Sequence, residues 1–152
     1  QASAHAFVDD KGVIEVIPAT EKAWHVRYDS PVDNQVYGFD ANDYALGIEL
    51  CYSTKGVIDN MKSYWNYVEY IASLCTTYNL DPRTSIISHQ KLDPSRRTDP
   101  INAFSKMGKT WDNFIEDVAY ITKPKVNNNY LERAQMLLNE VSELITKYKN
   151  GQ

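Results

Sequence analysis

The stretch over residues 84–100 most constrains what this chain can fold into. It reads Thr-Ser-Ile-Ile-Ser-His-Gln-Lys-Leu-Asp-Pro-Ser-Arg-Arg-Thr-Asp-Pro. The β-branched pair Ile86 and Ile87 predicts a short buried strand with His89 at its C-terminal end. A polar loop punctuated by prolines follows, and Asp99 stands ten positions after His89. Strand ends and the loops after them are where α/β proteins place their chemistry, so this stretch is the first candidate for a site.

A histidine and an aspartate held by one short loop can point at one metal ion. Imidazole nitrogen and carboxylate oxygen suit zinc, which accepts both donors in tetrahedral geometry. The pair His89 and Asp99 is a weak signal by itself, because a lone histidine at a strand end is more often structural and Asp-Pro is common in turns. The bare residues therefore leave both interpretations open.

A second apolar run, residues 44–52, predicts a central strand that helices cover on both faces. Glu49 is the exception within it. A carboxylate inside such a strand costs several kcal/mol unless it is paired, hydrated or near a metal. Glu49 is therefore either a strand-end side chain that reaches solvent or a salt bridge, or a general base with a tuned pKa.

Residues 60–78 predict an amphipathic helix, because apolar side chains recur at i, i+3, i+4 and i+7. Asp59 or Asn60 can cap its start. The helix leads into the strand before His89, which predicts a right-handed crossover. That connection would place Glu49 and His89 on neighbouring strands, where they could share one site.

The same patterns predict further elements outside these two strands. They are a hairpin of strands over 3–9 and 13–17, a short strand over 23–26, a long polar loop over 27–43 and a helix over 111–121.

The loop from His89 to Pro100 resembles the zinc-binding loop of the type 2 N-acetylmuramoyl-L-alanine amidases. That family includes phage endolysins, bacterial muropeptide amidases and peptidoglycan recognition proteins. The shared pattern is a histidine, a proline, a basic pair and then Thr-Asp-Pro. The Ser-Ala-His hairpin, the Ala-Trp-His segment and the Gly-Ile-Glu-Leu strand are also similar to the family. The resemblance covers residues 3–121.

The resemblance implies an α/β fold, a mixed β-sheet flanked by helices, to which this chain adds a C-terminal helix. It implies zinc-dependent hydrolysis of the amide between N-acetylmuramic acid and L-alanine in peptidoglycan. His89 and Asp99 match metal ligands, and Glu49 matches the catalytic glutamate. Arg97 matches a position usually held by lysine that steadies the oxyanion. His25 matches a substrate-binding position in the groove.

The chain departs from the family pattern in its ligand count. The family binds zinc through two histidines and one Asp or Cys, and its first histidine lies on a strand before the Ser-Ala-His hairpin. We therefore expect the third protein ligand from a segment upstream of Gln1, since two ligands seldom hold zinc tightly. A non-catalytic peptidoglycan-binding domain is the alternative, although such a domain need not keep Glu49.

Composition narrows the classes of partner. The net charge of −4 and a pI of about 5.3 argue against nucleic acid or anionic lipid as the main partner. No apolar run approaches a membrane span, and no signal peptide is visible. With the resemblance, this pattern fits a protein that acts on the cell wall, such as a phage lysin made in the cytoplasm and released. Cys51 and Cys75 are predicted to be buried free thiols.

The chain divides by pattern into three parts. We expect an amidase catalytic domain over 1–122, incomplete at its N-terminus, and a linker over 123–129. Residues 130–152 predict an amphipathic helix with heptad spacing over nearly three heptads. That helix either packs on its own domain, associates with another copy of the chain, or spaces the domain from a wall-binding module.

Overall fold

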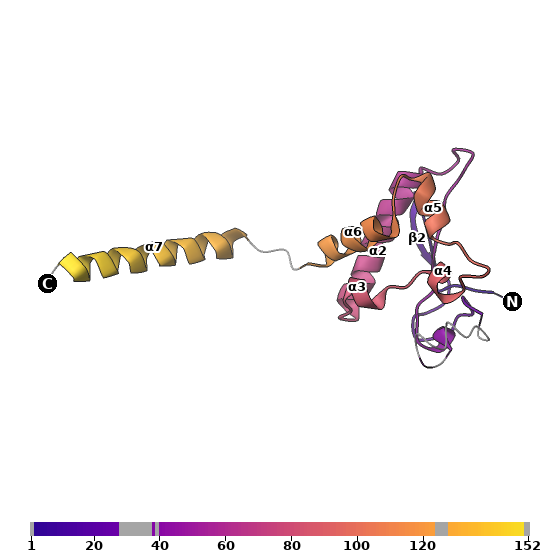
Figure 1. Ribbon diagram of the computed structural model, residues 1–152, viewed down its shortest axis with the longest axis horizontal. Helices are drawn as coiled ribbons and strands as arrows, with labels where there is room; N and C mark the ends of the chain where they lie inside the picture. The colour runs from indigo at the N-terminus through magenta and orange to yellow at the C-terminus, as the bar shows by residue number, and fades with distance from the viewer. Residues whose placement is uncertain (1, 28–37, 39, 124–127, 151–152) are drawn as a thin grey trace. The chain divides into compact units, whose positions relative to one another are not determined.

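The computed structural model describes residues 2–27, 38, 40–123 and 128–150, which form two compact units over 1–122 and 123–152 (Figure 1). The second unit holds α7 (Asn128–Asn150). The elements of the first unit are β1 (Ala6–Asp9), β2 (Gly12–Glu15), the 3₁₀ turn η1 (Ala41–Asp43), β3 (Ile48–Leu50), α2 (Asn60–Thr77), α3 (Pro82–Ser85), α4 (His89–Leu92), α5 (Ile101–Lys106) and α6 (Trp111–Thr122).

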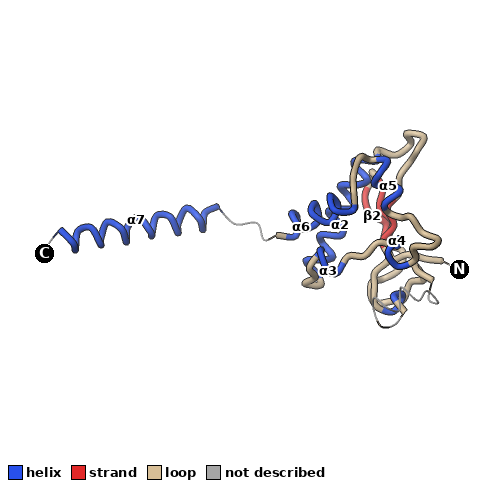
Figure 2. The backbone as a smooth tube through the Cα atoms, viewed as in Figure 1, coloured by secondary structure: helices blue, strands red, loops and turns tan. Residues whose placement is uncertain are grey.

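The described strands form one mixed sheet, as the sequence predicted (Figure 2). β1 lies in the middle, antiparallel to β2 and parallel to β3. Phe7 of β1 is in register with Ile14 on one side and with Glu49 on the other. Ala6 and Val8 are fully buried while Phe7 is exposed, because side chains alternate between the faces of a strand. One face of β1 therefore packs into the core.

The hairpin between β1 and β2 follows from its turn residues. The Asp9 carboxylate accepts hydrogen bonds from the backbone N–H groups of Lys11 and Gly12, at 2.7 and 3.2 Å. Gly12 has a φ of 141°, a conformation that residues with a Cβ rarely adopt. The turn residues therefore fix the register between β1 and β2.

Helix α2 begins and ends close to the predicted residues. Asp59 is its N-cap, and its carboxylate accepts a hydrogen bond from the backbone N–H of Lys62. Asn79 takes the left-handed conformation, with φ 53°, and the N–H of Leu80 donates to the carbonyl of Cys75 at 2.8 Å. This closing pattern satisfies the last carbonyls of the helix. Cys75 is buried and is a free thiol, as predicted, whereas Cys51 is a free thiol that is only half-buried.

Three aromatic rings at the centre of the first unit join α2, α5 and α6. The ring centroids of Phe104 and Phe114 lie 5.0 Å apart, and Tyr64 meets both rings edge-on at 5.7 and 6.4 Å. All three side chains are fully buried. The Tyr64 hydroxyl donates to Asp117 at 2.6 Å, and Lys109 donates to the same carboxylate at 2.9 Å. Burial and the neighbouring carboxylate raise the pKa of Tyr64.

The predicted strand before His89 does not form, which corrects the sequence interpretation. Asp81 caps α3 through the N–H of Arg83, and Ser88 caps α4 through the N–H of Lys91. Only residues 86–88 remain between the two helical turns, too few to form a ladder, although Ile86 and Ser88 have extended backbones. The predicted crossover is therefore wrong, and His89 begins a helix instead of ending a strand.

Two other strand predictions are also wrong in part. The strand predicted over 44–52 is reduced to β3, which among the described residues pairs with β1 alone and lies at the sheet edge. Residues 23–26 form no strand and are held to Ser3 and Asn42 by isolated hydrogen bonds. Most of the loop predicted over 27–43, and most of the linker over 123–129, lie outside the described residues.

Helix α7 forms where heptad spacing predicted a helix. Its described side chains from 133 to 149 are all exposed, including Leu138, Val141 and Ile145 at the predicted heptad positions. Within its own unit, α7 therefore presents an apolar stripe that no other described element covers. None of the described helices is long and apolar enough to cross a membrane.

Phe104→Ala tests the dependence of the first unit on its aromatic centre. We expect the variant to lose about 3–5 kcal/mol of unfolding free energy, because the side chain is fully buried and its removal leaves a cavity. Phe7→Ala is the control, since Phe7 is 39% exposed and should cost about 1 kcal/mol or less. Urea denaturation measures both. Equal losses in the two variants would contradict this account of the core.

Candidate active site

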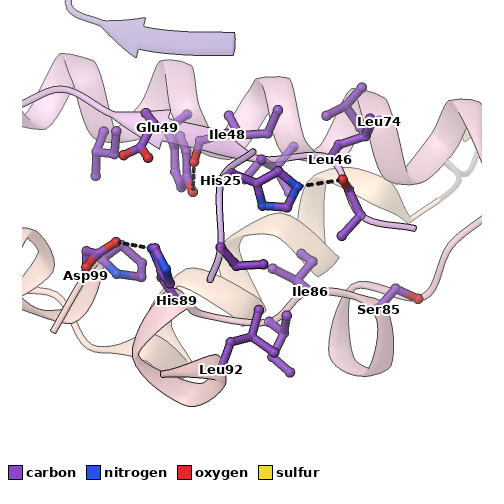
Figure 3. Close-up of a pocket in the computed structure, with 18 of the residues that line it drawn as sticks. His25, Leu46, Ile48, Glu49, Leu74, Ser85, Ile86, His89, Leu92 and Asp99 are labelled. Atoms are coloured by element: carbon purple, nitrogen blue, oxygen red, sulfur yellow. Dashed lines mark hydrogen bonds and ion pairs between the residues drawn. The ribbon is translucent and has the colours of Figure 1, made fainter. Parts of the chain in front are cut away.

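A groove of about 1070 Å³ lies between β3, α2 and the segment 84–103 (Figure 3). Polar side chains gather toward one end, where Glu49, His89 and Asp99 lie (Figure 3). Leu74 and Ile86 line the other end. The groove is lined by all five site residues predicted from the sequence: His25, Glu49, His89, Arg97 and Asp99.

His89 and Asp99 meet as the sequence spacing indicated. Nδ1 of His89 lies 2.9 Å from Oδ2 of Asp99. The loop between them is closed by the backbone, because the N–H of Gln90 donates to the carbonyl of Asp99 at 2.9 Å. Their side chains are 12% and 35% exposed, so both are partly screened from water yet reachable from the groove. The pair is therefore positioned by main-chain bonds and not by side-chain contacts alone.

Nε2 of His89 is buried and has no hydrogen-bond partner among the described residues. His89 and Asp99 could take part in binding a metal ion in two ways. His89 Nδ1 and the Asp99 carboxylate could bind one ion together, since atoms 2.9 Å apart can both reach a zinc at about 2.0–2.1 Å. Alternatively, Nε2 could bind the ion while Nδ1–H donates to Asp99, an arrangement common for metal-bound histidines.

The donors of this pair fit zinc chemically, but two protein ligands are fewer than a catalytic site needs. Within the part of the chain that the structure describes, no group of three His, Cys, Asp or Glu side chains could hold a metal ion. A third ligand would therefore have to come from outside the described residues.

Glu49 lies on β3, across the groove from His89 and Asp99 (Figure 3). Its side chain is exposed, which corrects the expectation of a carboxylate buried in a central strand. The burial argument for a functional role therefore does not hold. The remaining argument for a functional role is the position of Glu49, which lines the same groove as the His89–Asp99 pair.

Tyr67 of α2 lies beneath this end of the groove and was not identified from the sequence. Its hydroxyl donates to the carbonyl of Ile48 at 3.2 Å. Burial, together with the carboxylates of Glu49 and Asp99, raises its pKa. Tyr67 therefore acts as a neutral hydrogen-bond donor that fixes β3 beside Glu49.

His25 lines the groove, at the place where a substrate-binding residue was predicted. Its Nε2–H donates to the carbonyl of Ala45 at 2.9 Å, and its backbone N–H donates to the Asn42 side chain at 2.8 Å. Burial lowers its pKa from 6.5 to about 4, so the ring is neutral at pH 7. Gly47 packs against it: a Cβ at Gly47 would fall 2.4 Å from Cγ of His25.

His5 is structural. Its Nδ1 accepts a hydrogen bond from the N–H of Gly47 at 3.0 Å, and its Nε2 lies 3.0 Å from the carbonyl of Glu21. Nε2 must therefore carry the proton, and both ring nitrogens are engaged. These bonds tie the residue before β1 to Gly47, just before β3, and to Glu21, in the segment after β2. They leave no ring nitrogen of His5 for a metal.

The two adjacent arginines of the loop have different surroundings. Arg96 forms an ion pair with the buried Asp93, which holds the pKa of that carboxyl below its usual value. Arg97 lines the groove, and no described residue forms an ion pair with its guanidinium. Arg97 is therefore available to a ligand, whereas Arg96 stabilises the loop.

Asn102 and Tyr52 also line the groove and were missed in the sequence. Asn102 Nδ2 donates to the Tyr52 hydroxyl at 3.4 Å. The two residues are fifty positions apart, so no local pattern could have paired them.

The comparisons with known proteins agree with this fold. The structure resembles the solution structure of the PlyG catalytic domain, with a TM-score of 0.60, 25% identity, and coverage of 83% of this chain and 68% of that one. Residues 1–102 match the family model described as N-acetylmuramoyl-L-alanine amidase. The fold is thus that of an amidase-type catalytic domain. The chain belongs to the N-acetylmuramoyl-L-alanine amidase family.

Two curated relatives are themselves named as such amidases. The chain is 33% identical over 89 residues to the N-acetylmuramoyl-L-alanine amidase CwlA of a Bacillus species, covering 59% of this chain and 32% of that protein. It is 37% identical over 79 residues to a probable N-acetylmuramoyl-L-alanine amidase of Bacillus licheniformis, covering 52% and 22%. The chain therefore spans about a third or less of the length of these relatives.

His25→Gln tests the neutral state of the groove histidine. Glutamine keeps an N–H donor for Ala45 but does not titrate. Because the pKa of His25 is lower in the folded chain, the unfolded chain binds the extra proton, and stability falls as pH drops from 6.5 toward 4. Between pH 7 and 4.5, we expect the variant to lose about 2 kcal/mol less unfolding free energy than the wild type. Identical losses in urea denaturation would contradict the shift.

Proposed function

We propose that this chain hydrolyses the amide between N-acetylmuramic acid and L-alanine in peptidoglycan, as part of a phage or bacterial cell-wall lysin. Membership of the amidase family supports this substrate class. The observation that carries the proposal is the opposition of Glu49 to the His89–Asp99 pair across one groove (Figure 3). A carboxylate facing a candidate metal pair is the arrangement that metal-assisted amide hydrolysis needs.

In this proposal the cofactor is zinc. His89 supplies an imidazole nitrogen and Asp99 a carboxylate oxygen, and their 2.9 Å separation allows both to reach one ion. The buried, unpaired Nε2 of His89 supports a ligand at this residue, because buried polar atoms seldom remain without a partner. The third protein ligand lies outside the described residues.

Each of the predicted groove residues has a separate role in the proposed hydrolysis. A bound zinc would polarise the scissile carbonyl and activate the attacking water. Glu49 accepts a proton from that water and passes it to the leaving amine of L-alanine. Arg97 stabilises the negative charge that develops on the carbonyl oxygen, a role that its free guanidinium allows. His25, neutral at pH 7, forms part of the surface that binds the substrate.

We also propose separate functions for three segments of the chain. Residues 1–122 form the catalytic domain, 123–129 the linker, and 130–152 a helix that binds another copy of the chain or a wall-binding module. The exposed apolar stripe of Leu138, Val141 and Ile145 supports a helical partner, since such a stripe is stable only when covered.

Glu49→Gln tests the general base. In the zinc-loaded protein, we expect turnover of a muropeptide substrate to fall about a hundredfold or more, because glutamine cannot accept the proton, while zinc stays bound. Glu69→Gln on the exposed face of α2 is the matched control and should retain full turnover. Near-normal activity in Glu49→Gln would remove this residue from the mechanism. Substrate binding without turnover in the wild type would favour the non-catalytic alternative.

Zinc titration of variants tests the metal site and separates the two arrangements of the pair. With the third protein ligand in place, His89→Ala should weaken zinc binding by orders of magnitude. Asp99→Asn should cost about as much if the carboxylate binds the ion, but only about 10–100-fold if it orients His89 through Nδ1–H. Asp112→Asn, on the exposed surface of α6, is the control. Tight stoichiometric zinc that survives His89→Ala would rule out this loop as the metal site.

A further inference from the structure

Two buried side-chain atoms among the described residues have no hydrogen-bond partner: Nε2 of His89 and Oδ1 of Asn102. Both residues line the same groove. A metal ion bound through Nε2 would account for the first. Nothing in the proposed reaction uses the second. Because buried polar atoms normally find a partner, an unpaired acceptor beside a substrate groove indicates a bond that forms when the groove is filled.

The backbone of Asn102 is already fully engaged. Its N–H donates to the carbonyl of Thr98 at 3.0 Å, and its carbonyl accepts a hydrogen bond from the Ser105 hydroxyl at 2.9 Å. These bonds fix the first turn of α5, three residues after Asp99. The side chain therefore projects from a rigid position, and its carboxamide is the part left for a ligand.

Tyr52 completes the pair from the opposite wall. Its hydroxyl oxygen accepts the bond from Asn102 Nδ2 at 3.4 Å, and no described residue accepts the hydroxyl proton. The pair thus offers one acceptor, Asn102 Oδ1, and one donor, the Tyr52 O–H. A secondary amide carries the complementary set, because its N–H donates and its C=O accepts.

We propose that Asn102 and Tyr52 form a subsite that binds a secondary amide of the substrate. The inference rests on the proposed function, since peptidoglycan carries secondary amides both in its peptide bonds and in the N-acetyl groups of its sugars. The subsite lies beside the reacting groups and makes no bond in the reaction itself. It positions the substrate and sets which amide-bearing groups the groove accepts.

The direct test is the side-chain NH₂ signal of Asn102 in the ¹⁵N NMR spectrum of the full chain. One probe is the dipeptide L-alanyl-D-isoglutamine, and the other is tri-N-acetylchitotriose. A shift with the dipeptide assigns the subsite to a peptide bond, and a shift with the sugar assigns it to an N-acetyl group. Unchanged Asn102 signals with both probes overturn the proposal.

Asn102→Leu separates binding from folding. Leucine has the same branching pattern as asparagine, although it is larger, and it removes an unpaired buried acceptor, so the chain should be about as stable as the wild type. Probe affinity should fall about threefold to tenfold, the usual effect of losing one or two hydrogen bonds. Tyr52→Phe should weaken binding to a similar extent. Unchanged affinity in Asn102→Leu would overturn the subsite.

Asn113→Leu is the matched control. Asn113 Oδ1 accepts a hydrogen bond from the N–H of Thr110 at 3.1 Å at the start of α6, and the residue does not line the groove. This variant should be less stable than the wild type with unchanged probe affinity, the reverse of Asn102→Leu. Affinity losses that only follow stability in both variants would show a structural role for Asn102.

The outcomes also separate this inference from the amidase proposal. If signals of Glu49 and His89 shift on adding a probe while Asn102 does not respond, the subsite fails and the amidase proposal stands. If Asn102 responds but Glu49→Gln retains full turnover, the assignment of the general base fails and the subsite stands.

Discussion

The site depends on the packing of three aromatic rings some distance behind it. Tyr64, Phe104 and Phe114 lock α2, α5 and α6 together, with centroids 5.0–6.4 Å apart. The loop that carries Asp99 runs directly into α5, and α2 supports β3 through Tyr67. Both walls of the groove are therefore anchored to one core. Because a close-packed interior resists deformation, the two walls keep a fixed separation.

Within that frame, main-chain hydrogen bonds set the position of His89 and Asp99. The Ser88 cap starts α4 at His89, and the bond from Gln90 to the carbonyl of Asp99 closes the loop. These bonds hold the His89–Asp99 pair before any ligand arrives. Ligands held in advance lose less conformational entropy on binding, which favours metal affinity and precise orientation.

The sequence predicted helices better than strands, for a physical reason. α2 and α6 carry their periodicity in consecutive residues, so a local pattern suffices to find them. A strand exists only if a distant partner pairs with it. Ile86 and Ile87 are apolar because they line the groove, and caps on either side leave them no ladder. Glu49 is predicted from an argument on burial together with the family resemblance of its strand, whereas its exposed position beside the groove comes from the edge location of β3.

Sequence spacing could not decide which of the three histidines has a ring nitrogen available for a metal ion, but their hydrogen bonds can. In His5 both ring nitrogens are engaged by the backbone, and in His25 the Nε2–H donates to Ala45 while burial keeps the ring neutral. In His89 one nitrogen meets a carboxylate and the other has no partner among the described residues. Imidazole binds a metal only through a nitrogen free of a proton and of competing bonds. Among the buried side-chain nitrogens and oxygens of the described part of the chain, only this His89 nitrogen and Oδ1 of Asn102 have no hydrogen-bond partner, which is why the proposed metal ligand and the proposed amide subsite are assigned to these two residues.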